Sequence, residues 1–175
     1  MTASALFEDF SSTAELERLP EYLYAQVGGA WALCGKGIFS WSVFKFYTIR
    51  LLTASGNFDP EQPYILDLTY LRKLSAQQIV TISVQEIERL VTPTAEQTAH
   101  WRQALEAIVP DVSLGDRLLG WFRPGEGVEF FSASAALGAI PDAEFARAFA
   151  AIWLDPRTQR PALRQALLGK DRSAI

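Results

Sequence analysis

The amino-acid sequence predicts an α+β fold, in which a large antiparallel sheet is packed on one face by helices. Patterns typical of strands and of helices occur in separate blocks, whereas a parallel α/β sheet would need them to alternate. In addition, 49% of the 175 residues are hydrophobic and 12% are aromatic, so the chain can bury a core of its own. The expected element order is strands, two helices, a hairpin and two further helices.

The first block is predicted to form strands. Two short apolar runs, residues 22–27 and 30–34, flank a glycine pair that is typical of a tight hairpin turn. Glycines interrupt the chain again at 35–37, where a bend or bulge is expected. Residues 43–54 are rich in β-branched and aromatic side chains and are expected to form a central strand. After a proline-containing loop, residues 64–70 form the next expected strand.

Two helices follow, and each begins with a capping box, in which a serine or threonine and a glutamine three residues later cap the first turn. These motifs are Ser75–Gln78 and Thr94–Gln97. An apolar stripe with helical spacing follows each motif. Pro93 ends the first helix, and the second ends before Pro110, because the residue preceding a proline disfavours the helical conformation.

The C-terminal part is expected to contain a hairpin and two more helices. Alternating runs at residues 114–122 and 128–132 enclose a turn that holds proline and glycine. Asp142 can cap a helix whose apolar residues recur with helical spacing. Pro161 suits the first turn of a last helix, which Gly169 terminates.

Composition excludes several classes of function. Lys and Arg number 16 against 20 Asp and Glu, a net charge of −4 with no basic cluster, so neither nucleic-acid binding nor a polybasic membrane-surface motif is indicated. The single cysteine, Cys34, lies in an apolar run and is expected to be a small buried hydrophobe. The single histidine, His100, is expected on an exposed helix surface. No metal site and no cofactor are predicted.

Chain length and the distribution of apolar residues predict the domain organisation and the cellular location. Residues 1–18 are expected to form a polar leader and residues 19–175 a single domain. The leader lacks the apolar core of a signal peptide, so the sequence as written predicts a cytoplasmic protein, or a periplasmic one where a signal peptide has been removed. No apolar run approaches the ~18 residues of a membrane span. The sequence indicates no particular oligomeric state.

Candidate binding residues lie on the strand expected at 43–54. Lys45 and Tyr47 share one face at the period-two spacing of a strand, and Arg50 lies on the other face. A lysine and a phenol above an apolar floor can orient a polar ligand head group. The alternative is a lysine at the sheet margin and a tyrosine packed in the core. Asp67, in the following strand, is expected on the open face of an edge strand; on a covered face it would need a partner, or its pKa would rise.

Several segments together carry a family resemblance by their order and spacing: Leu33–Phe39, Val43–Leu51, Leu71–Gln78, Gly115–Arg117, Pro124–Val128, Phe145–Phe149, Ile152–Arg157, Leu163–Arg164 and Leu167–Gly169. They resemble the bacterial chalcone isomerase-like family, and the likeness covers roughly residues 19–169. The resemblance implies the chalcone isomerase fold, a large antiparallel sheet with helices on one side and an apolar cleft between them.

The resemblance also implies where an active site would lie. Chalcone isomerases place an arginine just after a Gly-x-Gly segment, a hydroxyl on the long strand and polar residues on the first helix. In this chain these positions fall on Phe39, on Tyr47 and near Ile79, Ile82 and Glu86. Without that arginine, the pocket is expected to lack the fixed positive charge that steadies a developing oxyanion. No catalytic residue is therefore predicted.

Another branch of the resembled fold binds fatty acids through an arginine and a tyrosine near the same two positions. Tyr47 matches the tyrosine, but Phe39 occupies the position of the arginine. Lys45 or Arg50 would therefore have to take the role of that arginine. The leading expectation is therefore a non-catalytic protein that binds a fatty acid or another amphiphile between sheet and helices, through these four residues. The alternatives are an isomerase or lyase for a chalcone-like or enone substrate, and a structural or partner-binding protein whose cleft is filled by side chains.

Overall fold

The computed structural model describes residues 18–170 and divides the chain into two compact units, 1–30 and 31–175, which are described separately. Residues 1–17, which make up nearly all of the polar leader predicted for 1–18, lie outside the described residues. Among the described helices, none is both long enough and apolar enough to cross a bilayer.

The described part of the first unit contains one helix, α2 (Glu21–Val27). The strand predicted for residues 22–27 is therefore wrong. The segment consists largely of good helix formers, and Glu21 in the first turn complements the helix dipole. Gly28 has a φ of 62°, and its N–H donates to the carbonyl of Tyr24. The glycine pair thus ends a helix and does not turn a hairpin.

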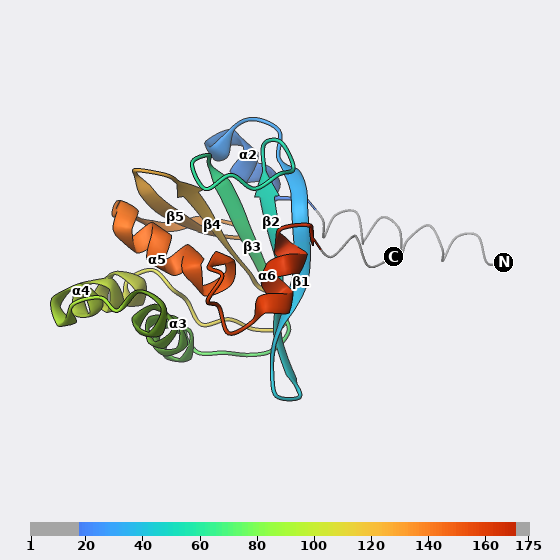
Figure 1. The fold of residues 1–175 in the computed structure, drawn as a ribbon. Coiled ribbons are helices and arrows are strands. Elements are labelled where there is room, and N and C mark those ends of the chain that lie inside the picture. Colours follow the sequence, from blue (N-terminus) through green and yellow to red (C-terminus); the bar gives the residue numbers. More distant parts are fainter. Residues whose placement is uncertain (1–17, 171–175) are drawn as a thin grey trace. The chain divides into compact units, whose positions relative to one another are not determined.

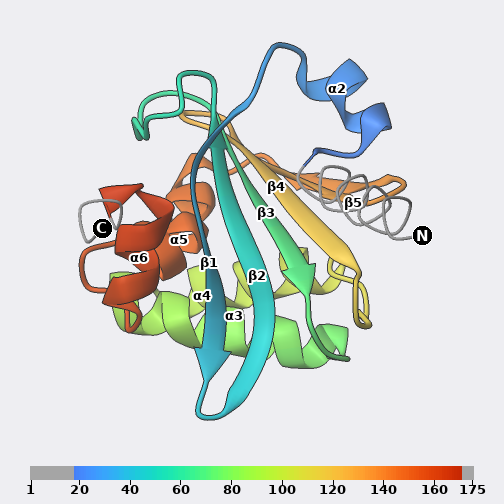
Figure 2. The ribbon, with the colours of Figure 1, turned by 90° about the vertical axis from the view of Figure 1, so that its right-hand side faces the viewer.

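The second unit is built on a six-stranded antiparallel sheet whose strands lie in chain order (Figures 1 and 2). The strands are β1 (Ala32–Trp41), β2 (Phe44–Thr53), β3 (Tyr64–Tyr70), β4 (Arg117–Arg123), β5 (Gly127–Ser132) and β6 (Ala136–Ile140). The strands predicted at 43–54 and 64–70 and the C-terminal hairpin are confirmed. However, β2 is the second strand from the edge, next to β1, where a central strand was expected.

The edge strand β6 was not predicted from the sequence. Its residues, Ala-Leu-Gly-Ala-Ile, include small side chains with a weak preference for strands. The segment becomes a strand because β5 presents a row of unpaired backbone groups, and β6 pairs antiparallel with it from Val128–Ile140 to Phe131–Ala136. The signal for this strand lies in the partner strand and not in β6 itself.

Four helices lie on one side of the sheet (Figures 1 and 2). They are α3 (Ala76–Val91), α4 (Ala95–Glu106), α5 (Ala143–Leu154) and α6 (Pro161–Leu167). Both predicted capping boxes are present, since Ser75 and Thr94 each accept from the backbone three residues on, and each glutamine side chain bonds back. Asp142 caps α5 by accepting from the Phe145 N–H at 3.0 Å. Pro161 occupies the first turn of α6, as predicted.

Two glycines of β1 let α6 pack directly on the sheet. The pairing of β1 with β2 shifts register between Leu33 and Gly35, which confirms the predicted bulge. A Cβ at Gly35 would collide with the backbone carbonyl of Ala166, and one at Gly37 would collide with the Leu163 side chain. Because neither glycine carries a Cβ, the helix backbone approaches the strand closely. This contact holds the loop that precedes α6 above β1 and β2.

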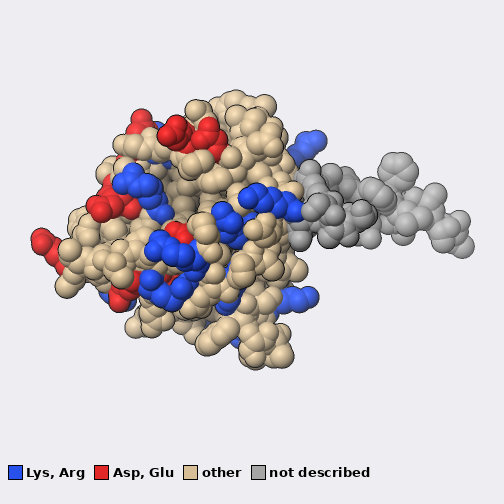
Figure 3. Space-filling view, in the orientation of Figure 1, with Lys and Arg blue, Asp and Glu red and all other residues tan. Residues whose placement is uncertain are grey.

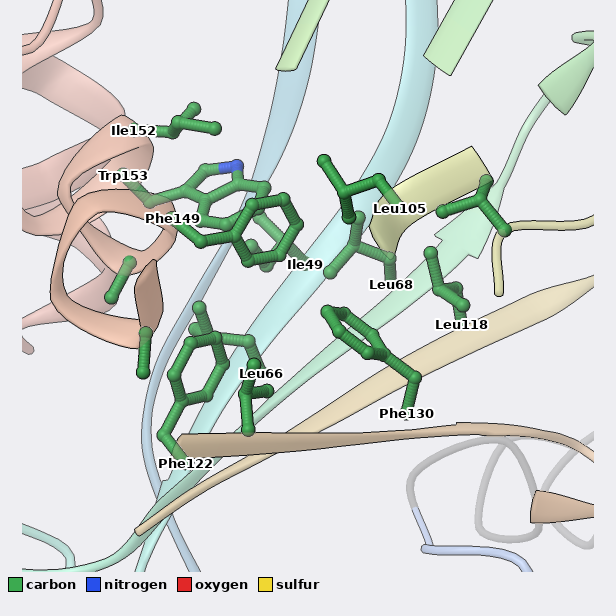
Figure 4. Close-up of a cluster of buried hydrophobic side chains, with 14 of the residues drawn as sticks. Ile49, Leu66, Leu68, Leu105, Leu118, Phe122, Phe130, Phe149, Ile152 and Trp153 are labelled. Atoms are coloured by element: carbon green, nitrogen blue, oxygen red, sulfur yellow. The ribbon is translucent and has the colours of Figure 1, made fainter. Parts of the chain in front are cut away.

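The hydrophobic core fills the space between the sheet and the helices. Figure 4 shows side chains from the strands, such as Leu66 and Phe130, directed toward Phe149 and Trp153 of α5. The Phe149 ring meets the rings of Phe130 and Trp153 edge-on, with centroids 5.5 and 5.2 Å apart. Aromatic side chains therefore close much of the interlayer space, in partial agreement with the filled-cleft alternative.

Candidate ligand-binding site

A cavity of about 230 Å³ lies between the β1–β2 hairpin, α3 and the loop that precedes α6. The strands contribute Phe39, Trp41 and Phe46 to its wall. Ile82 comes from α3, and Arg160 comes from the loop. Three segments that are far apart in the sequence thus surround one space, and the packing of α6 on β1 brings the loop to it.

An inner recess of about 60 Å³ adjoins this cavity and shares part of its wall, including Phe39, Ile82 and Ile152. Its deeper wall is formed by core residues of β2 and α5, among them Tyr47 and Trp153. The recess is lined mainly by aliphatic and aromatic side chains. The two spaces together therefore run from a partly polar entrance to an apolar interior, the order that an amphiphile requires.

The Tyr47 hydroxyl lies at the inner end of this path. It accepts a hydrogen bond of 2.9 Å from the indole N–H of Trp153. Burial, reinforced by the neighbouring Tyr70, raises the pKa of Tyr47 far above its ordinary value, so the phenol is neutral at physiological pH. Because its oxygen is already an acceptor, the hydroxyl proton remains available as a donor to a ligand.

A guanidinium lies at the entrance. The Arg160 Cζ atom is 4.1 Å from the centroid of the Phe39 ring, a cation–π arrangement, and that ring stacks on Tyr47 with centroids 4.8 Å apart. The positive charge of Arg160 also acts to lower the pKa of Tyr47, although burial dominates. The Arg160 Nε is buried and has no hydrogen-bond partner among the described residues.

The loop that carries Arg160 is held by its own hydrogen bonds. The buried Thr158 hydroxyl donates to the carbonyl of Ile152 at 2.7 Å and accepts from the backbone N–H of Arg160 at 3.3 Å. The Thr158 N–H donates to the carbonyl of Asp155. These bonds tie the loop to the end of α5, so the arginine backbone is in place before any ligand arrives.

The structure separates the four residues that the sequence suggested for ligand binding. Phe39 and Tyr47 lie at the site, and Ile82 and Glu86 of α3 line it as well. Lys45 is solvent-exposed and lines neither space, which agrees with the alternative of a lysine at the sheet margin. The carboxylate of Glu86 forms an ion pair of 3.2 Å with Arg89, so its charge is partly compensated.

Arg50 does not belong to this site, because it points to the opposite face of the sheet from Tyr47 and forms an ion pair with Asp67 at 2.6 Å. Arg117 contacts the same carboxylate at 2.7 Å. Asp67 is only 2% exposed and lies on the interior strand β3. Its expected place on an open edge strand is therefore wrong, and the alternative, that a covered Asp67 has a partner, is confirmed.

Sequence reasoning missed Arg160, and this omission changes the electrostatics of the site. The pocket was expected to lack a fixed positive charge because Phe39 stands where an arginine was sought. In the structure, a guanidinium from the opposite end of the sequence covers the Phe39 ring. No motif around Arg160 indicates this role, since only the packing of α6 on β1 brings the residue to the pocket.

The fold and the site define a class of protein: an open-faced α+β sandwich with an apolar pocket between its layers. The sequence matches the chalcone isomerase-like family over residues 21–169, and the chain belongs to that family. It is 31% identical over 144 residues to an uncharacterised protein of Haemophilus influenzae, covering 82% of this chain and 70% of that protein.

The fold is similar to that of a solved structure, a fatty-acid binding protein of Arabidopsis thaliana. The TM-score is 0.66 at 10% sequence identity, and the match covers 84% of this chain and 91% of the other. This likeness confirms the predicted α+β architecture. At so low an identity it concerns the fold alone.

Proposed function

We propose that this protein binds a fatty acid, or a similar amphiphile with an anionic head group, without transforming it. One observation carries the proposal: Arg160 sets a positive charge at the entrance to an apolar recess, with the Tyr47 hydroxyl further inside. A carboxylate would bind the guanidinium, whose hydrogen bonds to anions are stronger than neutral ones. The fatty-acid binding protein that shares the fold supports this choice of ligand class.

The size of the pocket restricts the ligand. Its outer cavity of about 230 Å³ is below the ~300–1,000 Å³ that is usual for small-molecule sites. The inner recess of about 60 Å³ adds little space unless the core aromatic side chains move. We therefore expect affinity to peak at medium chain lengths, because longer chains would have to displace Phe149 or Trp153.

Thermal unfolding with saturated fatty acids of increasing chain length tests the proposal. A ligand present at about 100 times its Kd should stabilise the protein by ~2.7 kcal/mol. For a chain of this size, that corresponds to a rise in Tm of about 5–10 °C. Fatty alcohols of matched length should stabilise it less, since they carry no charge for Arg160. Absence of a shift at every chain length would exclude the proposal.

Two substitutions separate the role of Arg160 from a general effect of charge. In Arg160→Gln, carboxylate binding should weaken by about tenfold or more, since hydrogen bonds to charged groups contribute ~1.5–3 kcal/mol. Arg147→Gln removes a cation from the exposed surface of α5 and should leave binding unchanged. Equal weakening in both variants would assign the effect to net charge.

The presence of Arg160 and Tyr47 near one pocket also supports an enzymatic alternative. A guanidinium and a neutral phenol near one pocket are groups that can stabilise an oxyanion. A chalcone or related enone would be the substrate to test, followed by its absorbance. We expect no turnover, because the helix positions facing the recess include the apolar Ile79 and Ile82. Turnover that is lost in Tyr47→Phe would replace the binding proposal with an isomerase.

A further inference from the structure

The tip of the β1–β2 hairpin exposes an unusual concentration of large hydrophobic side chains. Trp41 is 66% exposed, Val43 is 86% exposed and Phe44 is 52% exposed, all within four consecutive residues. The hairpin extends beyond the neighbouring elements at one end of the unit (Figures 1 and 2). Isolated exposed hydrophobic residues are common, but a cluster on a protruding turn marks an interaction site.

Positive charges surround this tip. Lys45 follows Phe44 in β2 and is exposed. The Arg72 guanidinium lies 4.7 Å from the centre of the Phe44 ring, and the adjacent Lys73 is also exposed. On the face seen in Figure 3, the protruding end shows no Asp or Glu. Although the chain carries a net charge of −4, the fold therefore collects three cations from two separate segments beside the tip.

A loop at the same end of the sheet also exposes an apolar side chain. The backbone N–H of Gly115 donates to the carbonyl of Tyr70, and the Tyr70 N–H donates to the carbonyl of Asp116. The loop therefore lies next to the segment that contains Arg72 and Lys73. In this loop Leu114 is 73% exposed. The Asp116 carboxylate accepts a hydrogen bond from the backbone N–H of Ser113, so this negative charge is held within the loop.

The tip is continuous with the ligand cavity. Trp41 lines the outer cavity while most of its surface faces solvent, so the hairpin forms part of the cavity entrance. A ligand that enters or leaves here passes the exposed tip. Apolar side chains on a convex turn, an interfacial tryptophan and flanking cations are the features of a segment that inserts shallowly into an anionic bilayer surface.

We propose that the hairpin tip docks on anionic lipid bilayers through Trp41, Val43 and Phe44, with Lys45, Arg72 and Lys73 facing the phosphate groups. Docking would place the cavity entrance at the lipid surface, where an amphiphile can pass between bilayer and pocket without crossing water. The exchange step rests on the proposed function, but docking itself does not require a ligand. The two can therefore fail independently.

Vesicle co-sedimentation of the full chain tests the docking. Vesicles of phosphatidylcholine containing a minority of phosphatidylglycerol should bind the protein more tightly than pure phosphatidylcholine, and salt should reduce that difference. Val43→Asp should weaken partitioning by about tenfold or more, because a carboxylate replaces the apolar side chain that would be buried in the bilayer. Leu33→Asp adds the same charge at the far end of β1 and should bind like the wild type.

Tryptophan fluorescence identifies the inserting residue. Brominated lipids should quench the wild-type emission, and Trp41→Phe should lose most of this quenching while still co-sedimenting. Fatty-acid binding in solution should be unchanged in Val43→Asp, since Val43 lines neither cavity. Failure of the wild type to bind either vesicle would overturn the docking proposal, as would equal losses in Val43→Asp and Leu33→Asp. A dimer in solution that Val43→Asp dissociates would also overturn it, by assigning the tip to a protein contact.

Discussion

The guanidinium of Arg160 lies above the ring of Phe39, with 4.1 Å between Cζ and the ring centroid, although the two residues come from opposite parts of the chain. Phe39 stands at the position where chalcone isomerases are expected to carry an arginine. The loop before α6 thus places a positive charge beside Phe39. The Phe39 ring provides the surface on which the Arg160 guanidinium lies.

Exchanging these two residues should preserve the site. Arg160→Phe alone should lower carboxylate affinity by about tenfold or more, because the cation is lost. Adding Phe39→Arg to this variant should restore most of the affinity, since a guanidinium and a ring again share the same place. Titration calorimetry with one fatty acid measures both variants. If the double variant bound the fatty acid no more tightly than Arg160→Phe alone, the direction of the Arg160 side chain would matter as well as its charge.

Tyr47→Phe should destabilise the protein by about 1–3 kcal/mol, because the buried Trp153 N–H loses its acceptor. The matched control is Tyr70→Phe, since Tyr70 is equally buried but no side-chain hydrogen bond is found for its hydroxyl among the described residues. Urea denaturation gives both free energies of unfolding. Similar costs in the two variants would mean that the bond to Trp153 contributes little.

Stability should fall as the pH rises above about 10. Burial raises the pKa values of Tyr47, Tyr64 and Tyr70 above the ordinary tyrosine value of 10.0, so the folded protein keeps protons that the unfolded chain has already released. The unfolded state then binds fewer protons, and the free energy of unfolding decreases by ~1.4 kcal/mol per pH unit for each tyrosine. Urea titrations across this range measure the slope. Tyr70→Phe should reduce it by about a third, and an unchanged slope would contradict the assignment.

Asp67→Asn should destabilise the protein by about 3–5 kcal/mol, because it removes the buried carboxylate that two guanidiniums share. Glu126→Gln serves as the control, since Glu126 pairs with Arg123 at the surface and its loss should cost about 1 kcal/mol or less. Chemical denaturation compares the two. If Asp67→Asn lowered the free energy of unfolding no more than Glu126→Gln does, the two buried ion pairs would contribute little to stability.

Local sequence signals predicted those elements whose ends or faces are determined by neighbouring residues. The capping boxes at Ser75 and Thr94, the cap at Asp142 and the proline at the start of α6 act within one helical turn. The family resemblance then identified the fold and the position of Tyr47. Each of these inferences needed only residues that lie close together or a familiar order of segments.

Elsewhere, local signals were ambiguous. The segment at 22–27 contains apolar residues compatible with either a strand or a helix, and in the structure it is α2. The strand β6 has almost no strand signal of its own and depends on the edge of β5. Asp67 was assigned to an exposed edge because alternation along a strand does not reveal which neighbours flank it.

By itself, the sequence determined the α+β class and the starts of the four helices that pack on the sheet. Only the tertiary structure decided that Arg160 reaches Phe39, that Arg50 pairs with Asp67 and that Arg72 lies against the hairpin tip. The physical reason is the range of the interactions. Capping and periodicity act over a few residues, whereas the charge of a pocket depends on which distant segments the packed core brings together.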